Sequence, residues 1–172
     1  MQTALIIILS ALASLVSIPV GNGGFRITFG IVVLISALHL FKPRHPLALA
    51  LATGLAVTLA RIFMDSMSME MTAALASSYL LEIAFYVAYA WIYRWAVTTN
   101  TSPYPLPLAV ALVLCDTGAN TIEFSLRHLA SDTIWDTTSF SAILLAAFVR
   151  SVVIVFVIWL SNYFSMRKSS AR

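Results

Sequence analysis

One stretch decides the class of this fold: Cys115-Asp116-Thr117-Gly118-Ala119-Asn120-Thr121-Ile122-Glu123-Phe124-Ser125-Leu126-Arg127, which directly follows an apolar run. A helix turns by about 100° per residue and gathers residues at i, i+4, i+7 and i+11 into one stripe. Four polar residues have that spacing: Asp116, Asn120, Glu123 and Arg127. A charge at mid-membrane costs at least about 2.5 kcal/mol unless it faces protein or water. The stripe therefore predicts compensating groups on neighbouring helices.

The composition identifies an integral membrane protein. Of 172 residues, 60% are hydrophobic and 10% are charged, with a mean hydropathy of +0.93; a soluble domain carries about 25% charged residues. The net charge of +3 is spread thinly, which argues against nucleic-acid binding. The single cysteine, Cys115, excludes an intramolecular disulfide, and no metal or cofactor site is expected. The amino terminus lacks the basic region of a signal peptide, so the first apolar run is interpreted as a retained helix.

Six apolar segments predict an all-α, polytopic membrane protein with a compact bundle of six transmembrane helices, since about 20 residues cross the hydrocarbon. The expected helices are Thr3–Val20, Arg26–Phe41, Pro46–Met64, Ala73–Trp95, Leu106–Arg127 and Phe140–Phe164. Residues 1–164 form the membrane domain, and residues 165–172 form a tail. The second segment is short, so it is tilted, partly re-entrant or buried among its neighbours.

Loop charges predict the orientation. If both termini lie on one side, that side holds most of the basic residues: Lys42, Arg44, Arg94, Arg167, Lys168 and Arg172. The opposite side holds the acidic loop residues Asp65, Glu70, Asp132 and Asp136. The positive-inside rule then places both termini and the tail in the cytoplasm of a multi-pass cell-membrane protein.

Other segments carry ionisable residues that match the stripe in depth. At 1.5 Å rise per residue, Asp116 and Arg150 both come near the midplane, which predicts an ion pair that registers two helices. Glu82 is followed by three tyrosines on the same face: Tyr86, Tyr89 and Tyr93. Most of the remaining charge lies in the outer half, around an expected site for a small polar, charged or zwitterionic molecule. Its expected lining residues are Arg26, Arg61, Glu82, Tyr86, Asn120 and Glu123.

The main alternative is that the buried charges only neutralise one another, with Glu123 paired to Arg61 or to Arg127. Proton or ion conduction is a further alternative. Enzymatic patterns are lacking: the sequence has no Walker loop, no His-Glu-x-x-His and no Ser-His-Asp arrangement. No catalytic residue is therefore expected. Small residues repeat on the Pro46–Met64 segment at Ala48, Ala52, Ala56 and Ala60, which indicates close helix packing or a docking face.

Four groups of residues resemble the amino-terminal membrane region of Firmicutes-type sensor histidine kinases, including the glutamine-responsive type. They are Phe25-Arg26-Ile27-Thr28-Phe29-Gly30, Gly54-Leu55 with Arg61 and Asp65, the Cys115–Arg127 stripe, and Phe148-Val149-Arg150. The resemblance implies a sensory input domain that signals through its last helix to a cytoplasmic kinase domain or response regulator, and that works as a homodimer. The sequence carries no phosphoacceptor helix or ATP-binding segment, so it is interpreted as the input domain of a longer protein or as a stand-alone relative.

A looser similarity connects the six helices to the substrate-binding subunits of energy-coupling-factor vitamin transporters. This similarity implies a solute-binding subunit that works with an energising partner, and it is a fold-level analogy only. The sequence thus favours a membrane-embedded sensor of a small polar ligand, with the transporter subunit as the alternative.

Overall fold

The computed structural model describes residues 2–20, 26–68, 72–100, 106–130 and 138–169. The described chain is helical except for one short ribbon of two antiparallel strands. Its elements are α1 (Gln2–Leu15), β1 (Ser17–Pro19), β2 (Arg26–Thr28), α2 (Gly30–Phe41), α3 (Pro46–Met67), α4 (Ala73–Tyr93), the π-helical turn η1 (Arg94–Thr98), α5 (Leu108–Leu129) and α6 (Phe140–Ser169).

The predicted boundaries of the first two helices are wrong. The first helix ends at Leu15 rather than Val20, and the second begins at Gly30 rather than Arg26. The intervening residues pair as an antiparallel ribbon in which Ser17 faces Thr28 and Pro19 faces Arg26. The physical reason is local, because Pro19 has no N–H to donate within a helix, and the β-branched residues around it favour extended backbone.

The other four helices follow the sequence prediction closely. α3 begins at Pro46, where a proline costs no helical hydrogen bond, and continues slightly beyond the predicted end, to Met67. α4 begins at Ala73 after Thr72, whose hydroxyl accepts a hydrogen bond from the N–H of Leu75, and it continues into η1. α6 begins at Phe140 and continues past the predicted end at Phe164 to Ser169.

Four helices are long and apolar enough to cross a membrane: α3, α4 with η1, α5 and α6. α1 has 14 residues and α2 has 12, so each is about 20 Å long at 1.5 Å per residue. These two helices are therefore shorter than the roughly 30 Å of hydrocarbon. The result supports a membrane protein, and six full-length spans are not shown.

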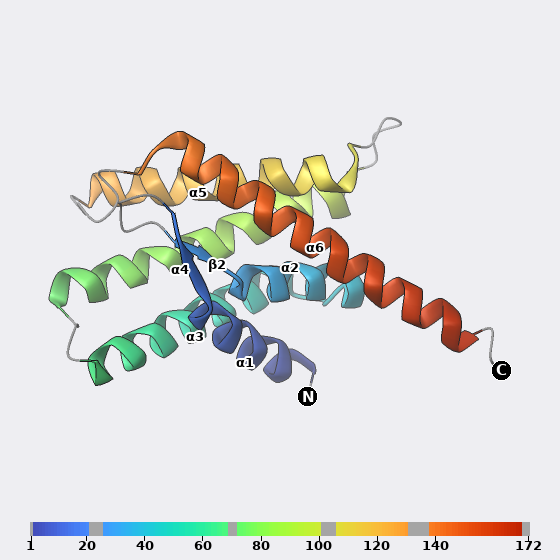
Figure 1. Ribbon diagram of the computed structural model, residues 1–172, viewed down its shortest axis with the longest axis horizontal. Coiled ribbons are helices and arrows are strands. Elements are labelled where there is room, and N and C mark those ends of the chain that lie inside the picture. The colour runs from blue at the N-terminus through green and yellow to red at the C-terminus, as the bar shows by residue number, and fades with distance from the viewer. Residues whose placement is uncertain (1, 21–25, 69–71, 101–105, 131–137, 170–172) are drawn as a thin grey trace.

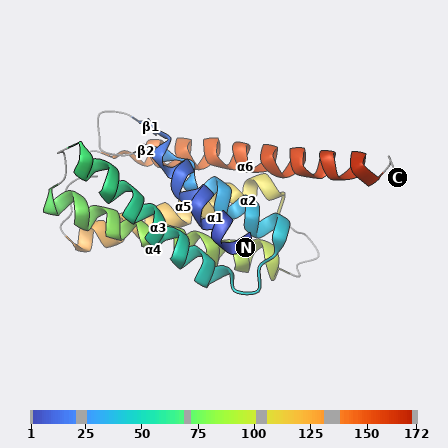
Figure 2. The same ribbon diagram turned by 90° about the horizontal axis from the view of Figure 1, so that it is seen from below.

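The helices alternate in direction, so the connections fall at two ends of the bundle (Figures 1 and 2). The start of α1, the α2–α3 turn, the end of η1 and the end of α6 lie toward one end. The ribbon, the end of α3, the start of α4 and the end of α5 lie toward the other. We call these the terminal end and the ribbon end.

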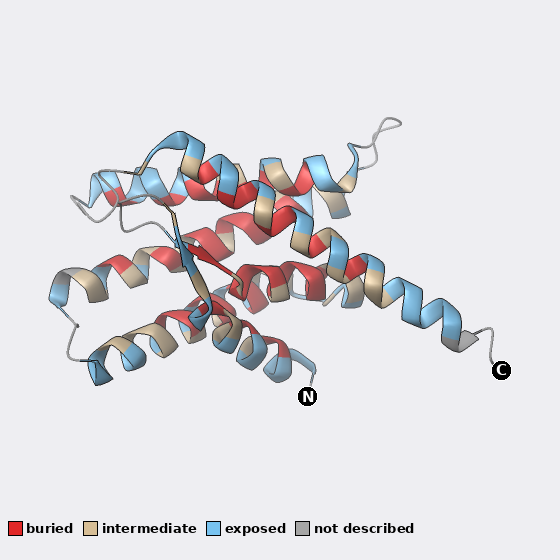
Figure 3. Ribbon diagram, in the orientation of Figure 1, coloured by how far each residue is buried: buried red, intermediate tan, exposed pale blue. Residues whose placement is uncertain are grey.

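The buried core runs through the middle of the bundle and centres on one face of α4 (Figure 3). Three tyrosines on that face are almost fully buried: Tyr86, Tyr89 and Tyr93. The hydroxyl of Tyr89 donates to the carbonyl of Leu112 on α5 at 3.2 Å, and that of Tyr93 lies 2.7 Å from Nδ1 of His39 on α2. These bonds fix α4 against both neighbours.

Candidate functional site

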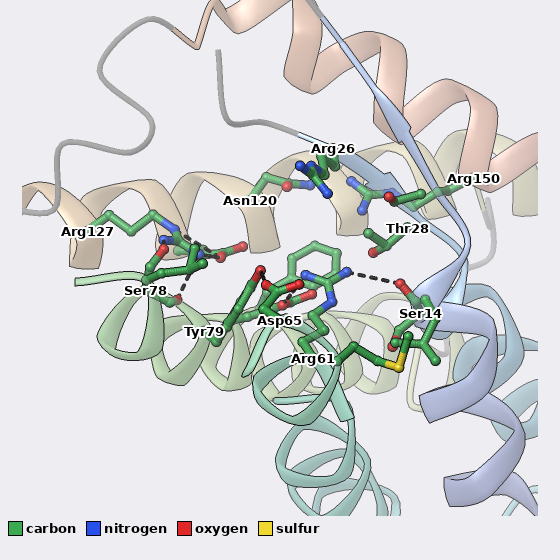
Figure 4. Close-up of a pocket in the computed structure, with 17 residues that line it drawn as sticks. Ser14, Arg26, Thr28, Arg61, Asp65, Ser78, Tyr79, Asn120, Arg127 and Arg150 are labelled. Carbon is green, nitrogen blue, oxygen red and sulfur yellow. Dashed lines mark hydrogen bonds and ion pairs between the residues drawn. The ribbon is translucent and has the colours of Figure 1, made fainter. Parts of the chain in front are cut away.

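A cavity of about 350 Å³ lies at the ribbon end, between α1, the ribbon and the four long helices (Figure 4). We call it the charged cavity, because four arginines and three carboxylates line it. Its lining residues are Ser14, Leu15, Ser17, Arg26, Thr28, Arg61, Met64, Asp65, Leu75, Ser78, Tyr79, Glu82, Phe85, Asn120, Glu123, Arg127 and Arg150.

The first ion pair in the wall joins α3 to α4. Nη1 of Arg61 lies 2.5 Å from Oε2 of Glu82, and both side chains are largely buried. Nη2 of Arg61 also donates to the carbonyl of Ser14 at the end of α1, at 3.3 Å. The guanidinium of Arg61 therefore connects α3 to α4 and to the end of α1.

The second ion pair lies within α5, and its arginine also connects α5 to α4. Nη2 of Arg127 lies 2.6 Å from Oε1 of Glu123, one turn earlier on the same helix. Arg127 also donates to the carbonyl of Ser78 at 3.0 Å and to the hydroxyl of Ser78. Both charged side chains are more than nine-tenths buried, which is tolerable only because each is paired and hydrogen-bonded.

The third ion pair joins α6 to α5. Nη2 of Arg150 lies 2.8 Å from Oδ1 of Asp116, so the structure brings together the two residues that the sequence pairs. Nδ2 of Asn120 donates to the same Oδ1 at 2.6 Å. The guanidinium of Arg150 also lies over the ring of Phe85, 5.0 Å from its centroid. Oδ2 of Asp116 and Nε of Arg150 are buried and have no hydrogen-bond partner among the described residues.

Two charges in the lining stand outside these three pairs. Arg26 is exposed on β2, and no carboxylate of the described chain lies within ion-pairing distance of it. Asp65 on α3 accepts a hydrogen bond from the hydroxyl of Tyr79 and is not paired with an arginine in the described residues. Figure 4 shows Arg26 entering from the ribbon and Asp65 from α3. The cavity thus presents one unneutralised cation and one unneutralised anion.

Five of the six residues expected to bind a ligand line this cavity: Arg26, Arg61, Glu82, Asn120 and Glu123. Tyr86 is not among the lining residues. It is fully buried, and its hydroxyl points to the close approach of α4 and α2 at Gly30. The sequence prediction placed Arg26 at the start of a helix, whereas the structure places it in strand β2.

The sequence interpretation missed several lining residues, including Asp65, Ser78 and Tyr79. Helical spacing carried the signal for two of them. Asp65 lies one turn after Arg61, and Ser78 one turn before Glu82, so each shares a face with a predicted site residue. For Ser17 and Thr28 the signal was absent, because the ribbon that contains them was not predicted.

The residues that the structure describes contain no cluster of three or more histidine, cysteine, aspartate or glutamate side chains that could hold a metal ion. Comparisons with protein-family models, with curated proteins and with solved structures find no match to this chain. The chemistry of the site therefore rests on its own residues.

Proposed function

We propose that this chain is a membrane-embedded domain that binds a small zwitterionic solute in the charged cavity. The observation that carries the proposal is the charge pattern of the lining, where three arginines are paired with carboxylates and Arg26 and Asp65 are not. A ligand with one anionic and one cationic group neutralises both residues at once. A ligand of a single charge would neutralise only one of the two residues.

The size and polarity of the cavity support an amino-acid-sized ligand. Its volume of about 350 Å³ is at the low end of the roughly 300–1,000 Å³ of small-molecule pockets. An α-carboxylate would pair with Arg26, and an α-ammonium group with Asp65. The resemblance to glutamine-responsive sensor kinases makes L-glutamine the first probe.

The proposed orientation places the terminal end of the bundle in the cytoplasm, with the chain as a multi-pass protein of the cell membrane. Basic residues on the terminal end support this orientation: Lys42, Arg44, Arg94 and Arg167. The positive-inside rule associates such residues with the cytoplasmic face. The charged cavity would then receive its ligand from outside.

We propose a sensory role, in which α6 carries the ligand-bound state toward a cytoplasmic kinase domain or response regulator. Arg150 lines the cavity, and the same helix continues without a break to Ser169. A ligand shifts an equilibrium between two helix arrangements only by its different affinity for them. The Arg150–Asp116 pair is suited to register such arrangements, because it joins α6 to α5.

A thermal-stability screen tests the proposed binding. The purified protein is heated in detergent with each of the common amino acids, beginning with L-glutamine, and with acetate and methylamine as ligands of one charge. We expect one or a few amino acids to raise the unfolding temperature and the two single-charge ligands to have no effect at equal concentration. If no zwitterion stabilises the protein, or if acetate alone does so equally, the proposal is wrong.

The sensory role needs a separate readout. Spin labels at Phe41, the last residue of α2, and at Phe164, on α6, report the distance between the two exposed positions. We expect the stabilising amino acid to shift that distance distribution. An unchanged distribution at saturating ligand would leave binding intact but contradict signalling through α6.

The alternative is a solute-binding subunit of an energy-coupling-factor-type transporter. The observation that favours it is the alanine row on α3, of which Ala52, Ala56 and Ala60 remain half exposed rather than fully packed. Small exposed residues let another helix approach closely within a membrane. Co-purification with a membrane scaffold protein, lost in an Ala56→Leu variant, would support this alternative over the sensor.

A further inference from the structure

A second cavity of about 370 Å³ lies at the terminal end, opposite the charged cavity. It is formed by the end of α2, the α2–α3 turn, the start of α3, the end of α4 and η1. We call it the basic pocket, because its charged lining residues are Lys42, Arg44 and Arg94, with His39 beside them. No carboxylate of the described chain lines it.

The cations of the basic pocket differ from those of the charged cavity in their ion pairing. There, three of the four arginines are within 3 Å of a carboxylate oxygen. Here, none of the three cations makes an ion pair with the residues that the structure describes. Three like charges around one cavity repel one another, and an anion bound in the cavity would offset that repulsion.

Backbone groups add to the positive potential. α3 begins at Pro46 in the pocket wall, and the preceding His45 makes no side-chain hydrogen bond to cap the first turn. The free N–H groups of such a turn, together with the helix dipole, favour an anion. Lys42 has a φ of 45°, and no other non-glycine residue in the described part of the chain has a positive φ. A glycine or asparagine would adopt that conformation at lower cost, so the lysine is held there against its backbone preference.

The surroundings of the pocket indicate the membrane interface. Trp91, about one turn before Arg94, and Trp95, directly after it, are 58% and 73% exposed. Exposed tryptophan at the end of a spanning helix is typical of the headgroup level of a bilayer. Basic pockets between helices at that level bind the head groups of anionic lipids.

We propose that the basic pocket binds the phosphodiester head group of an anionic phospholipid from the leaflet at the terminal end. The phosphate would be held by Lys42, Arg44 and Arg94 and by the first turn of α3, while the acyl chains remain in the bilayer beside α4. The site is independent of the ligand in the charged cavity, so either proposal can fail without the other.

Native mass spectrometry of the detergent-solubilised protein tests this site with phosphatidylglycerol, phosphatidylcholine and inorganic phosphate as probes. The pocket variant is Lys42→Gln with Arg94→Gln. The matched control is Arg167→Gln with Lys168→Gln, which removes the same amount of charge, and Arg167 does not line the pocket. Each basic residue near an anionic head group contributes about fivefold in affinity, so the pocket variant should bind phosphatidylglycerol about 25-fold more weakly.

We expect wild type and the control to bind phosphatidylglycerol within about threefold of each other, and both to prefer it to phosphatidylcholine. Binding should also weaken as salt rises, because exposed charges are screened. Equal losses in the two double variants would show general attraction to the basic end and overturn the site. Competition by inorganic phosphate at equal concentration would identify a soluble phosphate as the ligand and overturn the lipid assignment. Unfolding temperatures in phosphatidylcholine are compared as a check on folding, and we expect them to be equal, since Lys42, Arg94 and Arg167 are exposed.

Discussion

Arg150 on α6 reaches Asp116 on α5, with 2.8 Å between Nη2 and Oδ1, and the two side chains are 3% and 0% exposed. This ion pair lies beside the charged cavity and connects its wall to the longest helix of the chain. Removing one partner leaves the other as a buried, unpaired charge, which costs about 3–5 kcal/mol.

We therefore predict that Asp116→Ala and Arg150→Ala each lower the free energy of unfolding by about 3 kcal/mol or more. The double variant should lose clearly less than the sum, because it leaves no unpaired charge. Unfolding in mixed micelles, followed by circular dichroism, measures all three values. Additive losses would mean that the pair contributes nothing as a pair.

Substitutions of Arg61, which pairs with Glu82, distinguish the contribution of its charge from that of its planar hydrogen-bonding group. Arg61→Lys keeps the charge but gives up the planar group that also reaches the carbonyl of Ser14. We predict a loss of about 1 kcal/mol for lysine, typical of one hydrogen bond, and a larger loss for Arg61→Ala, which leaves Glu82 unpaired. Thermal unfolding compares the two, and equal losses would show that only the hydrogen bonds matter.

Three glycines lie where helices pack closely, and alanine substitutions at them should destabilise the protein to different degrees. A Cβ on Gly30 would lie 2.8 Å from the carbonyl oxygen of Ser10, one on Gly54 3.2 Å from Cα of Ile83, and one on Gly118 3.1 Å from the mobile end of Ile92. We predict that Gly30→Ala is the most destabilising, because backbone cannot move aside. Gly54→Ala should follow, and Gly118→Ala should be nearly neutral, since overpacking typically costs about 1–3 kcal/mol only where the neighbour cannot adjust. Expression level and unfolding temperature rank the three, and Gly118→Ala as the worst would contradict the packing described.

Helical periodicity predicted the parts of the fold where one pattern dominates. The Asp116–Arg127 stripe is one buried face of α5, and its residues face partners from α4 and α6. The depth comparison paired Asp116 with Arg150, because rise per residue is nearly constant along straight helices. The sequence left two partners open for Glu123, and the structure pairs it with Arg127.

The ribbon could not be predicted from periodicity, because strands of three residues are too short to show a period. Pro19 was the available signal, since proline disfavours the continuation of a helix. The consequence for the site is large. Arg26 reaches the cavity from a strand. Asp65, the anionic residue that Arg26 complements, reaches it from the end of α3, which the sequence prediction assigned to a loop.

Charge-selective titration tests the central claim, that Arg26 and Asp65 bind the two ends of a zwitterion. The stabilising amino acid from the screen is titrated calorimetrically into wild type, Arg26→Gln, Asp65→Asn and the control Arg167→Gln. Its analogues without the carboxylate and without the ammonium group are titrated in parallel. A charged hydrogen bond contributes about 1.5–3 kcal/mol, so each cavity variant should bind the zwitterion at least about 10-fold more weakly and the control should bind normally. Arg26→Gln should not change the affinity of the analogue without the carboxylate, nor Asp65→Asn that of the analogue without the ammonium group. Wild-type affinity for the zwitterion in both cavity variants would contradict the account.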